Sequence, residues 1–151
     1  MALPRTRSLV WLAIAVQASA SAQVPVKPGK WELTGAFQGL PFGGSDERVR
    51  TACISESALG SIPEKALMDA APQPTDDVSK PRPKCEYSNV RRDGAQSSWM
   101  LACEGPTMSG SGKATATPEQ LTLSESFDLK MPFGSRSIQH TVRARRLGDC
   151  S

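Results

Sequence analysis

Apolar and polar residues alternate along most of the chain. A period of two places apolar side chains on one face of a β-strand and polar side chains on the other. Clusters of glycine, proline and aspartate interrupt the alternation, and those at Asp93-Gly94 and residues 132–135 are typical of hairpin turns. The pattern predicts about seven strands, at residues 29–38, 47–54, 85–92, 96–103, 108–117, 121–131 and 137–145.

Signals for helix lie between the second and third predicted strands. Ser55 can cap a short helical turn, and Pro63 is typical of a first helical residue. Residues 72–83 are rich in proline, which pairs poorly within a sheet, so we expect an exposed connector there. The prediction is a mainly β fold: antiparallel strands in a curved meander sheet, a small barrel or a sandwich, with one short helical insertion.

The first residues have the layout of a secretory signal peptide. Two arginines precede the apolar run SLVWLAIAV, and Ala20-Ser21-Ala22 supplies the small residues of a cleavage site. A membrane-spanning helix needs about 20 apolar residues, and this run is shorter. We therefore expect residues 1–22 to be a cleaved signal peptide. Residues 23–151 would then form one exported domain without a transmembrane segment.

Four cysteines follow the predicted signal peptide and predict two disulfides. The register of the predicted hairpin allows a Cys85–Cys103 bridge, which would leave Cys53 for Cys150. We favour Cys53–Cys85 and Cys103–Cys150 instead. The first bridge would close the helical and proline-rich insertion, and the second would hold the last strand. A bridge across the hairpin would stiffen a turn that is already fixed and would gain less loop-closure entropy.

Four segments occur in an order that resembles a known family. They are PGKWE at 28–32, WMLAC at 99–103, GPTMSGSGK at 105–113 and RRLGDC at 145–150. Similar segments occur in small exported proteobacterial proteins classed as a domain of unknown function. The resemblance covers nearly all of the chain after residue 22. It implies a periplasmic location in a Gram-negative bacterium, and it implies no particular activity.

Charge and motifs narrow the classes of function. The formal charge of +3 includes two arginines of the signal peptide, so the exported chain would be close to neutral. Its net charge therefore indicates neither nucleic acid nor an anionic membrane as a partner. The chain has no G-x-S-x-G or H-E-x-x-H motif, and its single histidine cannot complete a zinc ligand set. We expect no metal or other cofactor. Of the classes of function considered, an enzyme has the least support.

Glu125 and His140 are polar residues at inward positions of the last two predicted strands. The turn between these strands places the two residues opposite each other or one diagonal apart. They can be a structural pair in which each satisfies the other, or they can lie at a sheet end open to water. Alternatively, they can be the polar groups that orient a ligand inside a cavity. The residues that would line such a cavity with them are Trp31, Phe37, Trp99, Phe127 and Met131.

Two functions follow from these patterns. The first is a non-catalytic periplasmic protein that binds a small apolar or lipid-like ligand in the curved sheet. The alternative is a protein-interaction or envelope-maintenance factor, with a filled core and no small-molecule ligand. Its partner would be another envelope protein. A cavity inside the sheet would favour the first function, and a filled core with an exposed apolar patch would favour the second.

Overall fold

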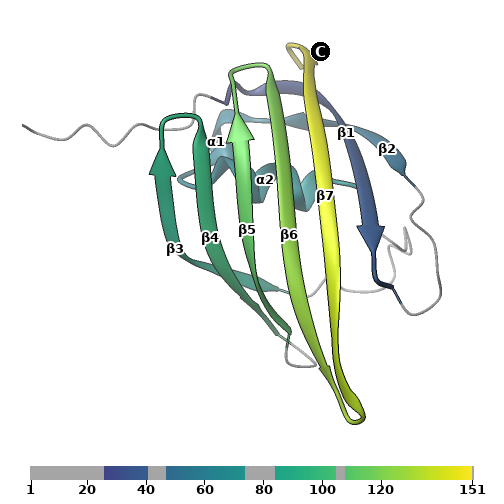
Figure 1. Ribbon diagram of the computed structural model, residues 1–151. Helices are drawn as coiled ribbons and strands as arrows, with labels where there is room; N and C mark the ends of the chain where they lie inside the picture. The colour runs from purple at the N-terminus through teal and green to yellow at the C-terminus, as the bar shows by residue number, and fades with distance from the viewer. Residues whose placement is uncertain (1–25, 41–46, 74–83, 105–107, 151) are drawn as a thin grey trace, which may run out of the picture.

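The computed structural model describes residues 26–40, 47–73, 84–104 and 108–150. In these residues the chain forms one sheet of seven antiparallel strands and two short helices (Figure 1). The strands are β1 (Gly29–Gln38), β2 (Arg48–Ile54), β3 (Cys85–Asp93), β4 (Gln96–Cys103), β5 (Met108–Ala116), β6 (Gln120–Met131) and β7 (Gly134–Gly148). The helices are α1 (Glu56–Leu59) and α2 (Pro63–Ala70). The predicted mainly β fold is confirmed.

The strands follow the order β2-β1-β7-β6-β5-β4-β3 across the sheet. Strands β3 to β7 form a meander, in which each strand pairs with the next. Strand β1 lies beside β7 and carries β2 on its other side. The first strand of the domain therefore meets the last within the sheet. Strands β2 and β3 are the two edges, and the described ladders form an open sheet rather than a barrel.

Two predicted hairpin turns are present. Gly94 connects β3 to β4 with a φ of +56°, and Gly134 follows the turn between β6 and β7 with a φ of +135°. Glycine adopts such positive φ values without the steric cost that other residues meet.

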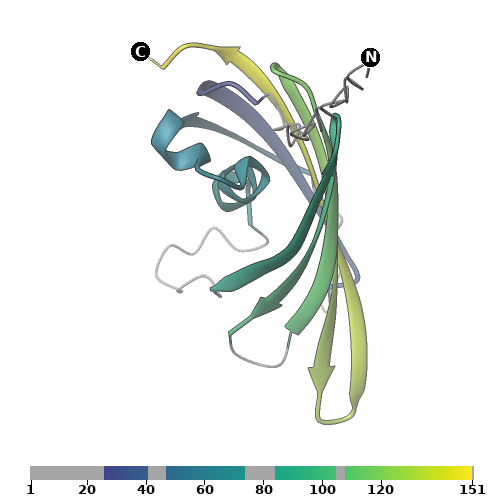
Figure 2. The same cartoon turned by 90° about the vertical axis from the view of Figure 1, so that its left-hand side faces the viewer.

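The sheet is curved, and both helices lie in its hollow (Figure 2). We call this hollow side the inner face. Apolar side chains of the inner face pack with apolar side chains of the helices into one core. Its members are Trp31, Leu33, Ile54, Leu59, Leu67, Met68, Ala71, Trp99, Leu101, Ala114, Ala116, Leu121, Leu123, Val142 and Ala144. Burial of each large apolar side chain stabilises the fold by about 1.5–3 kcal/mol.

The helical insertion begins where the sequence predicts it. The Ser55 side chain accepts a hydrogen bond from the Ala58 backbone N–H at 3.2 Å, and Pro63 is the first residue of α2. The connector after α2 differs from the prediction, because Pro72 is buried rather than exposed. Pro72 packs against Gly35, which has no side chain to keep it away. Residues 74–83 of the connector lie outside the described residues.

The favoured disulfide pairing, Cys53–Cys85 and Cys103–Cys150, is wrong. The bridges are Cys53–Cys150 and Cys85–Cys103. Cys53 and Cys85 lie on the two opposite edge strands, with five strands between them in the sheet. Cys85 instead faces Cys103 in the β3–β4 ladder. Cys150 reaches Cys53 past the end of β1, with a Cα–Cα distance of 5.7 Å.

The predicted signal peptide, residues 1–22, lies outside the described residues. Within the part of the chain that is described, no helix has the length and apolar character to cross a membrane. The two disulfides fit an exported protein, because such bridges persist in oxidising compartments.

Candidate functional site

Five strands each contribute one residue to a row that crosses the inner face. In this row Phe37 lies opposite His140, His140 opposite Glu125, Glu125 opposite Gly112, and Gly112 opposite Trp99. We call these five residues the central row. Strand register alone produces it, because cross-strand partners project from the same face of a sheet.

Glu125 is the acidic centre of the row, and its side chain is buried. Its Oε1 accepts two hydrogen bonds, one from Trp99 Nε1 at 3.0 Å and one from the Tyr87 hydroxyl at 3.2 Å. Burial disfavours the charged form and raises the pKa of Glu125 to about 7, although both hydrogen bonds oppose the shift. Near neutral pH this carboxyl group therefore exchanges between its protonated and ionised forms.

Gly112 makes the Trp99–Glu125 hydrogen bond possible. A Cβ atom on Gly112 would lie 2.2 Å from Cε2 and 2.3 Å from Nε1 of Trp99, much closer than any van der Waals contact. The indole therefore lies across β5, between its own strand β4 and Glu125 on β6. The sequence did not identify Trp99 as the neighbour of Gly112.

His140 has a stacking partner but an unsatisfied ring nitrogen. Its imidazole is stacked on the Phe37 ring, with a centroid distance of 3.8 Å and an interplanar angle of 11°. Within the described structure, Nε2 is buried and has no hydrogen-bond partner. Burial lowers the pKa of His140 to about 4, so the ring is neutral at physiological pH. Buried polar atoms without a partner are uncommon and call for an explanation.

Gly35 and Pro72 pack closely beside His140. A Cβ atom there would lie 3.5 Å from His140 Nε2 and 3.2 Å from the Pro72 carbonyl oxygen. Even a methyl group on residue 35 would therefore be tightly packed against Pro72 and His140.

The structure brings some of the predicted site residues together and separates others. Glu125 lies directly opposite His140, although no hydrogen bond joins them among the described contacts. Phe127, on the same face, is half-buried. Trp31 instead belongs to the filled core, where its Nε1 donates to the Lys27 carbonyl oxygen. Met131 lies at the end of β6 and is 43% exposed, so it does not line the inner face with the others.

A second buried carboxylate was not predicted. Glu64 on α2 is fully buried and receives both terminal nitrogens of Arg92, at 2.6 and 3.1 Å, and the Ser97 hydroxyl at 2.6 Å. Burial alone would raise the pKa of Glu64, but the bonds from Arg92 and Ser97 outweigh it and hold the pKa below its ordinary value. Because Arg92 and Ser97 are cross-strand partners in the β3–β4 hairpin, this cluster fixes α2 to the sheet.

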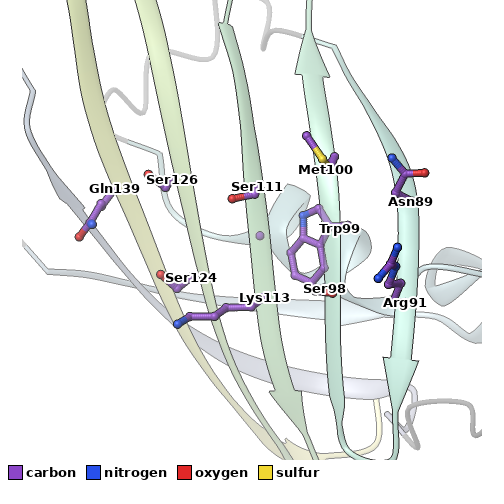
Figure 3. A pocket seen from close by; sticks show the side chains of 11 residues that line it. Asn89, Arg91, Ser98, Trp99, Met100, Ser111, Lys113, Ser124, Ser126 and Gln139 are labelled. Carbon is purple, nitrogen blue, oxygen red and sulfur yellow. The ribbon is translucent and has the colours of Figure 1, made fainter.

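The helix-free outer face carries a shallow groove of about 690 Å³ across β3 to β7 (Figure 3). Small polar side chains line most of it, and Figure 3 shows Lys113 extended toward Ser124 and the Trp99 indole between β4 and β5. Arg91 and Lys113 are the charged residues of its lining. This composition is typical of a solvated sheet face, and we assign the groove no role.

Fold and site together define a small, disulfide-bridged antiparallel sheet with a buried polar row beneath a helical cover. In the described part of the chain, no group of three or more His, Cys, Asp or Glu side chains is arranged to hold a metal ion. The sequence model of the family described as "Protein of unknown function (DUF3617)" matches residues 26–150, and the chain belongs to this family. The resemblance drawn from the sequence is thus confirmed. No curated protein and no solved structure matches the chain.

Proposed function

We propose that this protein is a non-catalytic periplasmic binding protein for a small, mostly apolar ligand with one hydrogen-bonding group. The observation that carries the proposal is the unpartnered His140 Nε2, which is buried beside Gly35 and Pro72. A polar atom in that position costs free energy unless a bound molecule or water satisfies it. Binding sites commonly combine an apolar lining with a few polar groups that orient the ligand.

The filled core limits where such a ligand can lie. The side chains of α1 and α2 already occupy the inner face around Trp31 and Leu33, both 0% exposed. Phe37, at one end of the central row, and Phe127, next to the row on β6, are only half-buried. We therefore place the apolar body of the ligand against Phe37 and Phe127, with its polar group toward His140.

The protonation states of the central row favour a neutral ligand. His140 carries no charge at pH 7, and Glu125 is close to half-protonated there because its pKa is about 7. An anionic ligand would thus lose its hydration without gaining a positive charge in the row to pair with. A hydroxyl or amine N–H that donates to Nε2 fits better than a carboxylate.

A periplasmic location is supported by the signal-peptide pattern of residues 1–22 and by the two disulfides. The first test is native mass spectrometry of the protein purified from the periplasm of its own cells. We expect an added mass of a few hundred daltons that is lost on denaturation. A spectrum with the mass of the protein alone would count against the proposal.

A second test uses N-phenyl-1-naphthylamine, an apolar fluorescent probe with a single N–H donor. The His140→Phe variant keeps the ring stack on Phe37 and removes Nε2. We expect probe affinity to fall about tenfold, the typical effect of one lost hydrogen bond. Met100→Ala, on the exposed outer face, is the matched control and should bind like the wild type.

The stability of His140→Phe separates a binding role from a structural role. Removing an unsatisfied buried nitrogen should leave the free energy of unfolding unchanged or raise it. A variant that unfolds more easily and still binds the probe would show that His140 serves the fold. In that case the alternative, an interaction factor with a filled core, becomes the better explanation.

A further inference from the structure

The hairpin between β6 and β7 extends beyond its neighbours. Strand β5 pairs with β6 only as far as Leu129, and β1 pairs with β7 only from Gln139 onward. The last rungs of the hairpin, up to Met131 opposite Gly134, therefore pair only with each other in the described ladders. Figures 1 and 2 show this hairpin projecting past the end of the sheet. We call residues 129–136 the hairpin tip.

The hairpin tip exposes apolar side chains at its end. Phe133 is 103% exposed and Met131 is 43% exposed. Pro132, between them, is exposed as well. A single exposed apolar residue needs no explanation, but adjacent ones at the end of a projecting ribbon are typical of a contact surface.

Positive charge surrounds this apolar end. Lys130 projects from the outer face of the ribbon, and Arg136, opposite Leu129, projects from the inner face. Residues 129–136 contain no carboxylate, and the nearest one belongs to Asp128. Neither Lys130 nor Arg136 forms an ion pair within the described residues, whereas Arg143 and Arg145 of β7 pair with Glu47 and Glu32.

We propose that the hairpin tip inserts Phe133 into the interface of a bilayer that contains anionic phospholipid. Lys130 lies one rung and Arg136 two rungs from the Met131–Gly134 pair that closes the turn, or roughly 3 and 7 Å along the strands. Phe133 lies beyond that pair, so insertion of its ring by roughly 5–10 Å would leave both cations among the headgroups. Cations on both faces of the ribbon suit a surface that surrounds the tip more than a one-sided protein pocket. The near-neutral charge of the whole chain does not oppose this, because the attraction is local.

The test is co-sedimentation of the purified, oxidised protein with phosphatidylcholine vesicles that do or do not contain phosphatidylglycerol. We expect the wild type to bind the anionic vesicles more tightly than the neutral ones. Phe133→Ser should weaken binding about tenfold, because it removes the inserted ring. Replacing both Lys130 and Arg136 with serine should weaken it by a similar or larger factor, and this loss should diminish at high salt.

Val49 offers a matched control. It is 64% exposed and has an arginine on either side in the sequence, but it lies on edge strand β2 rather than at a projecting end. Val49→Ser should bind vesicles like the wild type. Because Phe133 is fully exposed, Phe133→Ser should unfold at the same urea concentration as the wild type, so a loss of binding is not a loss of fold.

Phe133→Trp gives a direct readout. On anionic vesicles the emission from residue 133 should shift to shorter wavelength and be quenched by brominated acyl chains. The proposal is overturned if the wild type does not bind anionic vesicles, if Phe133→Ser binds them equally well, or if Val49→Ser loses as much affinity. Tight binding of the tip to a protein, without vesicle binding, would also overturn it.

Discussion

Gly112 sets the geometry of the buried carboxyl group, because it leaves the space in which the Trp99 indole reaches Glu125. We predict that Gly112→Ala lowers the free energy of unfolding by about 2–3 kcal/mol, since the new methyl group displaces the indole. In a Trp99→Leu background the same change should cost much less, because the clash is gone. Urea unfolding of the four proteins of this double-mutant cycle measures the coupling. Equal losses of unfolding free energy in both backgrounds would show that the residue 112 methyl group does not clash with Trp99.

The raised pKa of Glu125 predicts a pH-dependent stability. Between about pH 4.5 and 7 the folded protein keeps a proton on Glu125 that the unfolded chain releases, so stability falls as pH rises through this window. Glu125→Gln removes this contribution. Relative to the variant, the wild type should lose up to about 3 kcal/mol of unfolding free energy from pH 4.5 to 7. Urea unfolding of both proteins at matched pH values measures the difference.

His140 has the opposite pH dependence, which makes the paired comparison necessary. Its pKa is lowered, so stability falls as pH drops from about 6.5 toward 4, when the unfolded chain takes up a proton that the fold excludes. This contribution is present in both the wild type and Glu125→Gln and cancels in their difference. A difference that is flat from pH 4.5 to 7 would show that Glu125 ionises as in the unfolded chain.

The alternation pattern could identify only part of the candidate site. Glu125 and His140 interrupt apolar positions, and the register of the last hairpin places them opposite each other, so the sequence was sufficient for this pair. The Trp99 side chain crosses Gly112 to contact Glu125, two strands away. Alternation within single strands cannot show a contact of this kind between strands. Glu64 follows Pro63 directly, as acidic residues do at many helix starts, so nothing in the sequence marked it as buried.

Among the elements, α2 depends on a few polar contacts as well as on its apolar side. The Glu64–Arg92–Ser97 cluster joins it to the β3–β4 hairpin. We predict that Glu64→Ala lowers the unfolding free energy by about 3–5 kcal/mol, because it leaves the half-buried Arg92 uncompensated. Hydrogen exchange should become faster in α2 and in the β3–β4 hairpin before the rest of the sheet.

Lys65→Ala is the control for that prediction. Lys65 pairs with Asp69 one turn along the same helix, at 2.5 Å, but both side chains are largely exposed. Exposed pairs of this kind contribute about 0.5 kcal/mol or less. A similar cost for Lys65→Ala and Glu64→Ala would mean that the helix itself, rather than its anchor to the hairpin, is the sensitive part.

The two edge strands differ from the strands inside the sheet. Edge strand β3 contains a bulge between Ser88 and Arg91, with Asn89 at a φ of +51°. Edge strand β2 has arginines on both sides of its exposed Val49. Bulges and charges at an edge discourage the addition of further strands, so both edges of this open sheet are protected against edge-to-edge pairing.

At the scale of the whole molecule, the two disulfides hold different parts of the fold. Cys53 and Cys150 are 97 residues apart, and Cys85 and Cys103 are 18 apart. Loop-closure entropy then predicts a loss of about 4–5 kcal/mol for Cys53→Ala/Cys150→Ala and about 3 kcal/mol for Cys85→Ala/Cys103→Ala. Urea unfolding under oxidising conditions compares the two double variants. The reverse ranking would show that strain or unfolded-state structure, rather than loop length, determines their contributions.

Most of the fold was predictable, and the error in the disulfide pairing has one cause. Strands, turns and helix starts are local, so alternation, Asp93-Gly94 and Pro63 located them. The order of strands across the sheet is not local. Because β1 pairs with β7, strands β2 and β3 become opposite edges, and this arrangement determines which cysteines meet. Reasoning from loop lengths alone therefore chose the wrong bridges.

The pairing of β1 with β7 also affects the order in which the strands join the sheet. Synthesis proceeds from the N-terminus, so β1 and β2 are made well before their neighbour β7. Until β7 appears, they are a two-stranded ribbon, which is marginally stable in water, and Trp31 and Leu33 lack their final cover. The meander from β3 to β7 has local contacts and can form first. We therefore expect the earliest-made strands to join the sheet last. The Cys53–Cys150 bridge should form at that final step.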